Sequence, residues 1–299
     1  MKKKILVSGG TGFIGYHIVK KCIALKWSVA ILSSRKPNKL RYIKNVEYIR
    51  CNVTKKKDIQ KKLRKNYDYV VNLAGYVNHV EKKKTFSSHY NGSKNLADHF
   101  KKKKIKSFVQ ISSGAEYGNL KSPHNEKIKC FPASNYGKAK YFATKHLLKL
   151  FKQNKFPCTI LRLYQIFGPK QDQNRFIPVV IKNSLENKKF NVSSGKQQRD
   201  FLYVDDVVDA VIKCLIKKKS RGEIFNVGCG KPFEIKKILL LIVKICKGGT
   251  PIYGKINLRK EENLITYPST NKIKKFLNWK PKYSFSNGLK KTIKLYAKK

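Results

Sequence analysis

Short apolar runs alternate along the first half of the chain with longer segments in which apolar residues recur at helical spacing. The apolar runs predict buried β-strands at 5–7, 29–32, 46–49, 69–73 and 108–111. Helical spacing predicts helices near 14–25, 86–100 and 135–151. Strands that alternate with helices in this way are typical of an α/β protein with a doubly wound parallel sheet. Ligands of such sheets bind at the carboxyl ends of the strands.

The first predicted strand leads directly into a glycine-rich turn, and a predicted helix follows. Gly9, Gly12 and Gly15 keep G-x-x-G-x-x-G spacing, and Gly10 with the last two keeps G-x-G-x-x-G spacing. Glycines at these positions let the backbone approach a pyrophosphate, which the amides at the helix N-terminus then bind. A lone glycine turn is a weak signal, but the strand–turn–helix context predicts a dinucleotide-binding Rossmann domain.

The end of the second predicted strand bears on the choice of cofactor. In NAD-binding turns, an acidic residue about 20 positions past the glycines binds the ribose hydroxyls. No acidic residue lies between Gly15 and Glu47, and Ser33, Ser34 and Arg35 follow the strand instead. Because hydroxyls and a guanidinium suit a 2′-phosphate, the sequence favours NADP over NAD. The alternative is a basic surface turn with Arg35 directed at water.

A third group of polar residues opens the helix predicted at 135–151. Tyr136 and Lys140 are four residues apart and therefore lie on one helical face. A lysine cation stabilises a phenolate, so we expect it to lower the pKa of Tyr136 from about 10 towards neutrality and to make the phenol a proton acceptor and donor. Ser113, at the end of the strand predicted at 108–111, is placed to hydrogen-bond the same substrate oxygen. Tyr-x-x-x-Lys spacing is common by chance. The prediction of a catalytic group therefore depends on the order along the chain of the glycine turn, the strand-end serine and the Tyr–Lys helix.

Seven stretches spread over nearly the whole chain form one pattern: Gly9–Gly15, Asn72–Gly75, Ser112–Gly118, Tyr136–Lys140, Leu161–Pro169, Arg199–Val207 and Phe225–Gly230. Together they resemble the extended short-chain dehydrogenases/reductases of the nucleotide-sugar epimerase/dehydratase group. The resemblance implies that Ser113, Tyr136 and Lys140 form a catalytic triad. It also implies that Tyr136 moves the proton of a sugar hydroxyl while a nicotinamide takes or gives the hydride.

The resemblance also implies binding residues. Besides Tyr136 and Lys140, the cofactor contacts are expected at Gly9, Gly12, Phe13, Ile14, Gly15, Ser33, Arg35, Asn52, Val53, Leu73, Ala74 and Gly75. Arg199 resembles the arginine that holds the substrate diphosphate, a role that suits bidentate pairing, and Arg259 resembles a second clamp. Gln165 stands where relatives often have a phosphate-contacting Asn. The alternative for each arginine is an exposed side chain or a surface salt bridge.

Departures from the family pattern narrow the chemistry. Dehydratases of the group carry an Asp-Glu pair after the residue that corresponds to Ser113, but Gly114 and Ala115 occupy those positions here. We therefore do not expect 4,6-dehydration. Ala115 also replaces the glutamate of decarboxylating relatives, and Glu116, displaced by one place, is interpreted as structural. Asn52 replaces the usual Asp near the adenine, which leaves the cofactor's base contacts open.

Residues 1–170 are expected to form the NAD(P)-binding Rossmann domain, with 195–230 returning to it, and 171–299 a smaller α/β part that mainly binds substrate. Asp205 and Asp206 are expected to cap the helix predicted at 207–216 rather than to bind a metal. The six histidines show no ligand spacing, so no metal is predicted. The seven cysteines form no C-x-x-C pair and are expected to be reduced thiols.

The formal net charge of +51 would by itself suggest a nucleic-acid partner. However, only nine of the 68 basic residues are arginine, and the lysines occur in short runs typical of solvated helix faces. We therefore expect no specific nucleic acid. No apolar run approaches the roughly 20 residues of a membrane span, and glycines interrupt the segment after Met1–Lys4, so a cytoplasmic location is expected.

The leading hypothesis is an NAD(P)-dependent 4-ketoreductase or 4-epimerase that acts on C4 of a nucleoside-diphosphate hexose, as a homodimer like many relatives. The Ser33–Arg35 turn favours the reductase, because NADPH is the usual free reductant. Two alternatives stay open: a non-catalytic nucleotide-binding protein with the same fold, and a basic nucleic-acid-binding protein. The sugar and the nucleotide base are not predicted.

Overall fold

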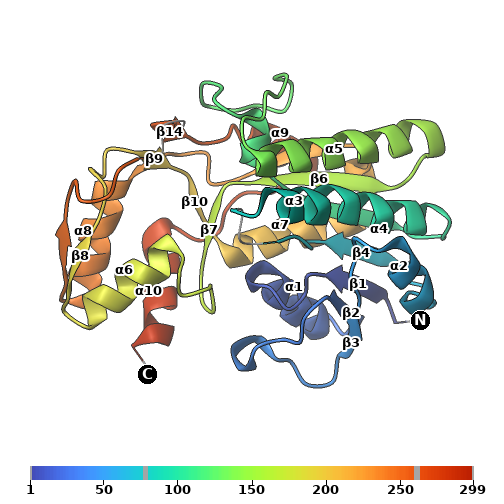
Figure 1. Ribbon diagram of the computed structural model, residues 1–299, viewed down its shortest axis with the longest axis horizontal. Helices are drawn as coiled ribbons and strands as arrows, with labels where there is room; N and C mark the ends of the chain where they lie inside the picture. The colour runs from blue at the N-terminus through green and yellow to red at the C-terminus, as the bar shows by residue number, and fades with distance from the viewer. Residues whose placement is uncertain (1, 77–79, 259–262, 298–299) are drawn as a thin grey trace.

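A seven-stranded parallel sheet forms the centre of the molecule in the computed structural model, which describes residues 2–76, 80–258 and 263–297 (Figure 1). The strand order is β11-β6-β5-β4-β1-β2-β3. The strands are β1 (Lys4–Ser8), β2 (Ser28–Ser33), β3 (Glu47–Arg50), β4 (Tyr69–Asn72), β5 (Ser107–Ser113), β6 (Cys158–Leu163) and β11 (Ile224–Val227). The order reverses between β1 and β4, and open α/β sheets bind ligands at such a switch point. The predicted doubly wound α/β fold is confirmed.

Helices cover both faces of this sheet. One face packs against α1 (Phe13–Ala24) and α7 (Val204–Ile216), with α9 (Asn271–Leu277) beside β11. The other face packs against α2 (Lys56–Lys62), α4 (Gly92–Lys101) and α5 (Asn135–Asn154). Figure 1 shows α1 and α7 on one side of the sheet and α4 and α5 on the other.

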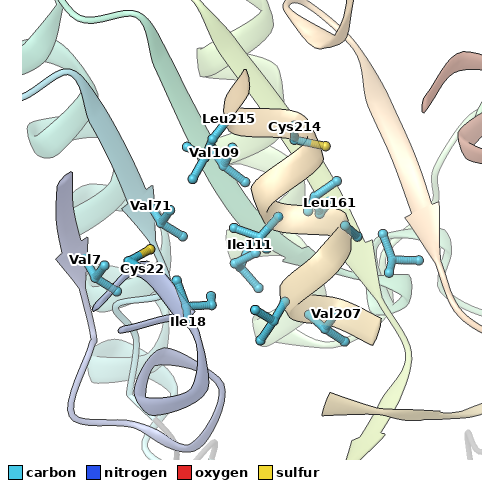
Figure 2. Packing of buried hydrophobic residues seen from close by; sticks show 14 of the residues in the cluster. Val7, Ile18, Cys22, Val71, Val109, Ile111, Leu161, Val207, Cys214 and Leu215 are labelled. Atoms are coloured by element: carbon cyan, nitrogen blue, oxygen red, sulfur yellow. The ribbon is translucent and has the colours of Figure 1, made fainter. Parts of the chain in front are cut away.

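Alternate strand residues serve the two faces, because successive side chains of a strand point in opposite directions. Val7, Val71 and Ile111 pack towards α1 and α7, as Figure 2 shows. Leu6 and Val70 pack towards the opposite helices. Both faces are therefore dry, which explains why the strands appear in the sequence as continuous apolar runs.

The C-terminal part builds a separate apolar cluster at one end of the molecule (Figure 1). Its helices are α6 (Phe176–Leu185), α8 (Ile235–Cys246) and α10 (Phe285–Tyr296). Short strands form three small sheets: β7 (Gln165–Phe167) with β10 (Phe201–Tyr203), β8 (Lys189–Asn191) with β13 (Thr250–Ile252), and β9 (Gln198–Arg199) between β12 (Phe233–Glu234) and β14 (Ile265–Thr266). Between β10 and β12 the chain returns to the main sheet, where it forms α7 and β11. The division into 1–170 and 171–299 by function stays a prediction.

The helix predicted at 86–100 is interrupted. It consists of α3 (Lys82–Phe86), a π-helical turn η2 (Ser87–Asn91) and α4. Within the turn, the Gly92 N–H donates to the carbonyl of Ser87, five residues earlier. The strand predicted at 46–49 is shifted by one residue, to Glu47–Arg50.

The predicted cap at Asp205 and Asp206 is wrong. Helix α7 begins at Val204, before both residues, and no side chain caps it. The buried Asp206 carboxylate instead accepts hydrogen bonds from the backbone N–H groups of Lys282, at 2.8 Å, and Tyr283, at 3.2 Å. Asp206 therefore fastens the segment that precedes α10 onto α7.

All seven cysteines are free thiols. Within the described residues, no group of three or more His, Cys, Asp or Glu side chains is arranged to hold a metal ion. No helix in the described part of the chain has both the length and the apolar character to cross a membrane.

Candidate active site

The glycine turn lies between the end of β1 and the start of α1, at the switch point of the sheet. Gly9 adopts φ +80°, which favours glycine. A Cβ on Gly15 would lie 2.3 Å from the carbonyl oxygen of Gly9, so only glycine allows helix and turn to pack this closely. No side chain caps α1 at Gly12, and its first turn, which contains Phe13 and Ile14, holds no acidic residue. This helix start suits a phosphate group.

The end of β2 lies next to this turn. Ser33 Oγ is 2.9 Å from Thr11 Oγ1, and it also donates to the carbonyl of Arg35 at 2.8 Å. Arg35 is exposed, and its charge acts on the phenol of Tyr76. The structure therefore brings Ser33 and Arg35 to the edge of the glycine turn, but the Ser33 hydroxyl already has partners there.

The predicted adenine contacts lie on the loop after β3. Asn52 Oδ1 accepts hydrogen bonds from the backbone N–H of Thr54 at 3.0 Å and from its hydroxyl at 2.8 Å. Val53 is buried, and Asn95 of α4 donates to its carbonyl at 3.1 Å. The loop is thus held in shape by its own side chains and by α4.

The turn after β4 packs against the glycine turn. A Cβ on Gly9 would lie 2.9 Å from the carbonyl carbon of Leu73, so the two backbones nearly touch. The buried Asn72 accepts a hydrogen bond from the Ala74 N–H at 3.1 Å and thereby shapes the turn. Leu73, Ala74 and Gly75 therefore line the same edge of the sheet as the glycines.

The three predicted catalytic residues are brought together. Ser134 caps α5 by accepting a hydrogen bond from the Gly137 N–H at 3.0 Å, which places Tyr136 in the first turn of the helix. The side chains of Ser113 and Tyr136 are hydrogen-bonded to each other. Lys140 Nζ lies 5.8 Å from the centroid of the Tyr136 ring and donates to the carbonyl of Ile111 at 2.8 Å.

The expected effect of Lys140 on Tyr136 is not seen in this structure. Burial raises the pKa of Tyr136, and the hydrogen bond with Ser113 opposes that rise. Burial also lowers the pKa of Lys140 to about 8. The prediction that the lysine brings the tyrosine pKa towards neutrality is wrong in direction here, because desolvation of the phenol outweighs the hydrogen bond with Ser113.

A buried ion pair lies beneath these residues. Glu116 is fully buried and accepts hydrogen bonds from Arg162 Nε at 3.1 Å and Nη2 at 2.8 Å. Its other carboxylate oxygen accepts from the hydroxyls of Ser112 and Thr144. Glu116 thus connects β5, α5 and β6, as expected of a structural residue.

The sequence patterns missed His89. This buried side chain packs edge-to-face on Tyr136, with ring centroids 4.9 Å apart. It lies in the segment that predicted a plain helix. The only signal was the polar run from Ser87 to His89 within an otherwise helical pattern.

A cleft of about 800 Å³ begins at Ala115 and Ser134, two residues after Ser113 and two before Tyr136 in the sequence, and extends to Phe201. Gln165 and Arg199 both line it, so the structure brings these predicted substrate residues together. Arg199 Nη1 also donates to the carbonyls of Gln198 and Leu264, at 2.8 and 2.9 Å. Arg259 lies outside the described residues. A second cavity of about 410 Å³, between α2 and α4, contains none of the predicted site residues.

A Rossmann sheet with a glycine turn between β1 and α1 and a Tyr–Lys pair on α5 is typical of an extended short-chain dehydrogenase/reductase. The family model described as the NAD dependent epimerase/dehydratase family matches residues 5–228, and the chain belongs to this family. The resemblance found in the sequence is thereby confirmed.

The relatives include several nucleotide-sugar enzymes. A putative UDP-glucose 4-epimerase of Methanocaldococcus jannaschii is 30% identical, over 97% of each chain. Human dTDP-D-glucose 4,6-dehydratase is 27% identical, over 98% of this chain and 90% of the relative. The solved structure of a UDP-glucose 4-epimerase from Thermotoga maritima with UDP-glucose is 27% identical, with a TM-score of 0.90 over 98% of both chains.

Proposed function

We propose that this protein is an NAD(P)-dependent enzyme that transfers hydride at C4 of a nucleoside-diphosphate hexose, as a 4-epimerase or a 4-ketoreductase. One observation carries the proposal: Ser113, Tyr136 and Lys140 meet beside a cleft that contains Arg199, and the cleft reaches them at Ala115, whose N–H donates to Ser113 Oγ at 3.1 Å. This arrangement offers a proton-transfer group beside the predicted cofactor edge and a cation farther along the cleft for a diphosphate.

The residues present fit a nicotinamide dinucleotide. Gly15 lets α1 pack against the glycine turn so closely that a Cβ would lie 2.3 Å from the Gly9 carbonyl oxygen, and the uncapped start of α1 suits a pyrophosphate. When bound, the cofactor would accept or supply the hydride. Tyr136 would hold or release the proton of the C4 hydroxyl, and Ser113 would orient the same oxygen. Lys140 would supply positive charge beneath the phenol.

On the substrate side, Arg199, Gln165 and Arg259 are the proposed diphosphate contacts. A 4,6-dehydratase reaction is not proposed, although dehydratases are among the relatives. A Cβ on Gly114 would lie 2.8 Å from the ring of Tyr164, so an acidic side chain there has no room unless Tyr164 moves.

The two candidate reactions rest on different observations. The relatives named UDP-glucose 4-epimerase favour epimerisation, in which one carbon is oxidised and reduced again. The Ser33–Arg35 turn favours NADP and hence a reductase that consumes free NADPH. Incubation with a panel of nucleotide sugars and 4-keto sugars, with and without NADPH, separates them. Product formed without net coenzyme consumption contradicts the reductase.

Replacement of Tyr136 by Phe tests the proposed acid/base. The substitution removes only the phenol oxygen, so turnover should fall by at least about 10²-fold while NAD(P)H affinity stays within about twofold. Activity is followed by sugar conversion and affinity by NADPH fluorescence. The matched control is Tyr141→Phe, one residue after Lys140 on the same helix. Full activity of Tyr136→Phe would remove this residue from the mechanism.

The alternatives make different predictions. A non-catalytic nucleotide-binding protein would hold NAD(P) and convert none of the sugars. A nucleic-acid-binding protein would show a steeply salt-dependent affinity that survives substitution of the glycines.

We further propose a homodimer in the cytoplasm. A group of aromatic rings on the outer side of α3, η2 and α5 supports the dimer: Phe142 is 44% exposed and contacts Phe86 and Tyr90. Sedimentation velocity measures the oligomeric state, and a monomer at micromolar concentration contradicts the proposed homodimer.

A further inference from the structure

His89 lies between the turn after β4 and the ring of Tyr136. The side chain is 6% exposed. Its ring packs edge-to-face on Tyr136, with an interplanar angle of 81°. On the other side, its Nε2 lies 3.1 Å from the carbonyl oxygen of Tyr76. Because a carbonyl only accepts, Nε2 carries the proton in this bond. One side chain therefore contacts both the proposed acid/base and the backbone that follows Gly75.

The neighbouring residue Ser88 binds the backbone N–H of Tyr76. The Tyr76 N–H donates to Ser88 Oγ at 2.9 Å, and Ser88 Oγ donates to the carbonyl of Thr85 at 3.1 Å. Consecutive side chains of η2 thus bind both backbone polar groups of Tyr76. This turn is π-helical, and π turns within longer helices occur frequently at functional sites.

Gly75 and His89 are sterically coupled. A Cβ on Gly75 would lie 1.9 Å from Cε1 and 2.2 Å from Nδ1 of the His89 ring. Any side chain at position 75 must therefore displace the imidazole. Because Gly75 ends the turn that lies against the glycine-rich loop, the same contact joins the cofactor edge to η2.

We propose that His89 is a positioning residue that links the cofactor-binding turn to Tyr136. Its ring holds the Tyr136 ring in the orientation that presents the phenol to the sugar. Its Nε2–H holds the Tyr76 carbonyl and, through it, the turn Leu73–Gly75. The inference rests on the proposed function, since it takes Tyr136 as the acid/base, but the link between His89 and the turn Leu73–Gly75 is tested separately.

Two substitutions separate the two contacts. His89→Gln keeps a side-chain donor for the Tyr76 carbonyl and removes the ring, whereas His89→Phe keeps a ring and removes the donor. For His89→Gln we expect kcat to fall about tenfold or more, with the NADPH Kd within about twofold, because the phenol is misoriented. For His89→Phe we expect kcat within about threefold and the NADPH Kd raised about fivefold, the effect of one lost hydrogen bond. Tyr90→Phe, in the same turn, is the matched control and should change neither value.

A steric pair provides a second test. Gly75→Ala should weaken NADPH binding in the wild-type background, because the methyl group displaces the imidazole. In a His89→Ala background the same substitution should have a much smaller effect, since the space is then open. Equal effects of Gly75→Ala in both backgrounds contradict the link.

The outcomes distinguish the two proposals. If His89→Gln and His89→Phe lower only the melting temperature and leave kcat and Kd unchanged, His89 only packs the core and the inference is overturned. If the wild type converts no nucleotide sugar, the proposed function fails, while the NADPH Kd of His89→Phe against Tyr90→Phe still decides whether His89 supports the cofactor turn.

Discussion

Lys140 shows what burial does to a single catalytic candidate. Its side chain is 4% exposed, and desolvation lowers its pKa to about 8. Glu116 opposes this decrease through its charge. The ammonium is also held by the Ile111 carbonyl. Keeping the Lys140 ammonium charged inside the fold therefore costs free energy of folding.

This desolvation cost predicts that wild type and Lys140→Met differ in free energy of unfolding by an amount that depends on pH. The pKa of Lys140 is about 8 when folded and about 10.4 when unfolded. Between these values the unfolded chain binds more protons, so the contribution of Lys140 to stability rises with pH. The free energy of unfolding of wild type minus that of Lys140→Met should grow by up to about 3 kcal/mol from pH 7 to 10.5. Urea titrations measure it, and a difference that shrinks with pH contradicts the burial argument.

For single residues, the sequence predicted which predicted catalytic side chains lie together but not which other side chains surround them. The spacing of Tyr136 and Lys140 and the strand-end position of Ser113 were sufficient, because helix and strand geometry fix such positions locally. The direction of the Tyr136 pKa shift was predicted wrongly, since it depends on how many atoms from other elements cover the phenol. His89 was missed for the same reason, because its contact with Tyr136 joins residues 47 positions apart.

Three elements of the site are joined by one buried carboxylate. Glu116, in the short turn that follows β5, pairs with Arg162 of β6 and accepts a hydrogen bond from Thr144 of α5. Removal of either charge leaves its partner buried and uncompensated, which costs about 3–5 kcal/mol. Replacement of both by apolar residues of similar volume avoids that penalty.

We therefore expect Glu116→Leu and Arg162→Met each to lower the free energy of unfolding by about 3–5 kcal/mol. The double variant should lose less than the sum, by at least about 2 kcal/mol. Urea denaturation of the wild type, the two single variants and the double variant gives the free energies of this double-mutant cycle. Strict additivity would mean that the two side chains do not stabilise each other.

The five predicted strands were placed to within one or two residues of their bounds, whereas features that depend on distant residues were missed. The predicted parallel strands are all present, because apolar runs covered on both faces need no other signal. The cap assigned to Asp206 failed because its carboxylate binds the backbone at Lys282 and Tyr283, far along the chain. The π turn at Ser87–Asn91 likewise depends on the Tyr76 backbone, which the helical period does not reveal.

Across the whole molecule, the sequence predicted the main sheet better than the C-terminal part. The small sheets there use strands of two or three residues, such as β9 and β14, which carry no periodic pattern. Their pairing follows from which segments α6, α8 and α10 bring together. The division of labour between the two parts stays a prediction, and the cleft that Arg199 and Phe201 share with Ala115 is where it can be tested.

The whole molecule carries a large excess of positive charge. With 68 basic and 17 acidic residues, the formal net charge is +51, and the excess positive charges repel one another. Salt screens this repulsion, because the Debye length falls from about 30 Å at 0.01 M to about 3 Å at 1 M. The melting temperature should therefore rise by at least about 3 °C between 10 mM and 500 mM NaCl. Binding to heparin should disappear over the same range.

The catalytic group should respond differently to salt. Tyr136 and Lys140 interact over short distances in a desolvated site, where mobile ions screen little. We therefore expect kcat to change less than about twofold over the range that raises the melting temperature. A melting temperature that falls with NaCl would mean that ion pairs outweigh the repulsion. Polyanion binding that persists at 500 mM NaCl would instead favour a dedicated nucleic-acid surface and assign the lysines a function.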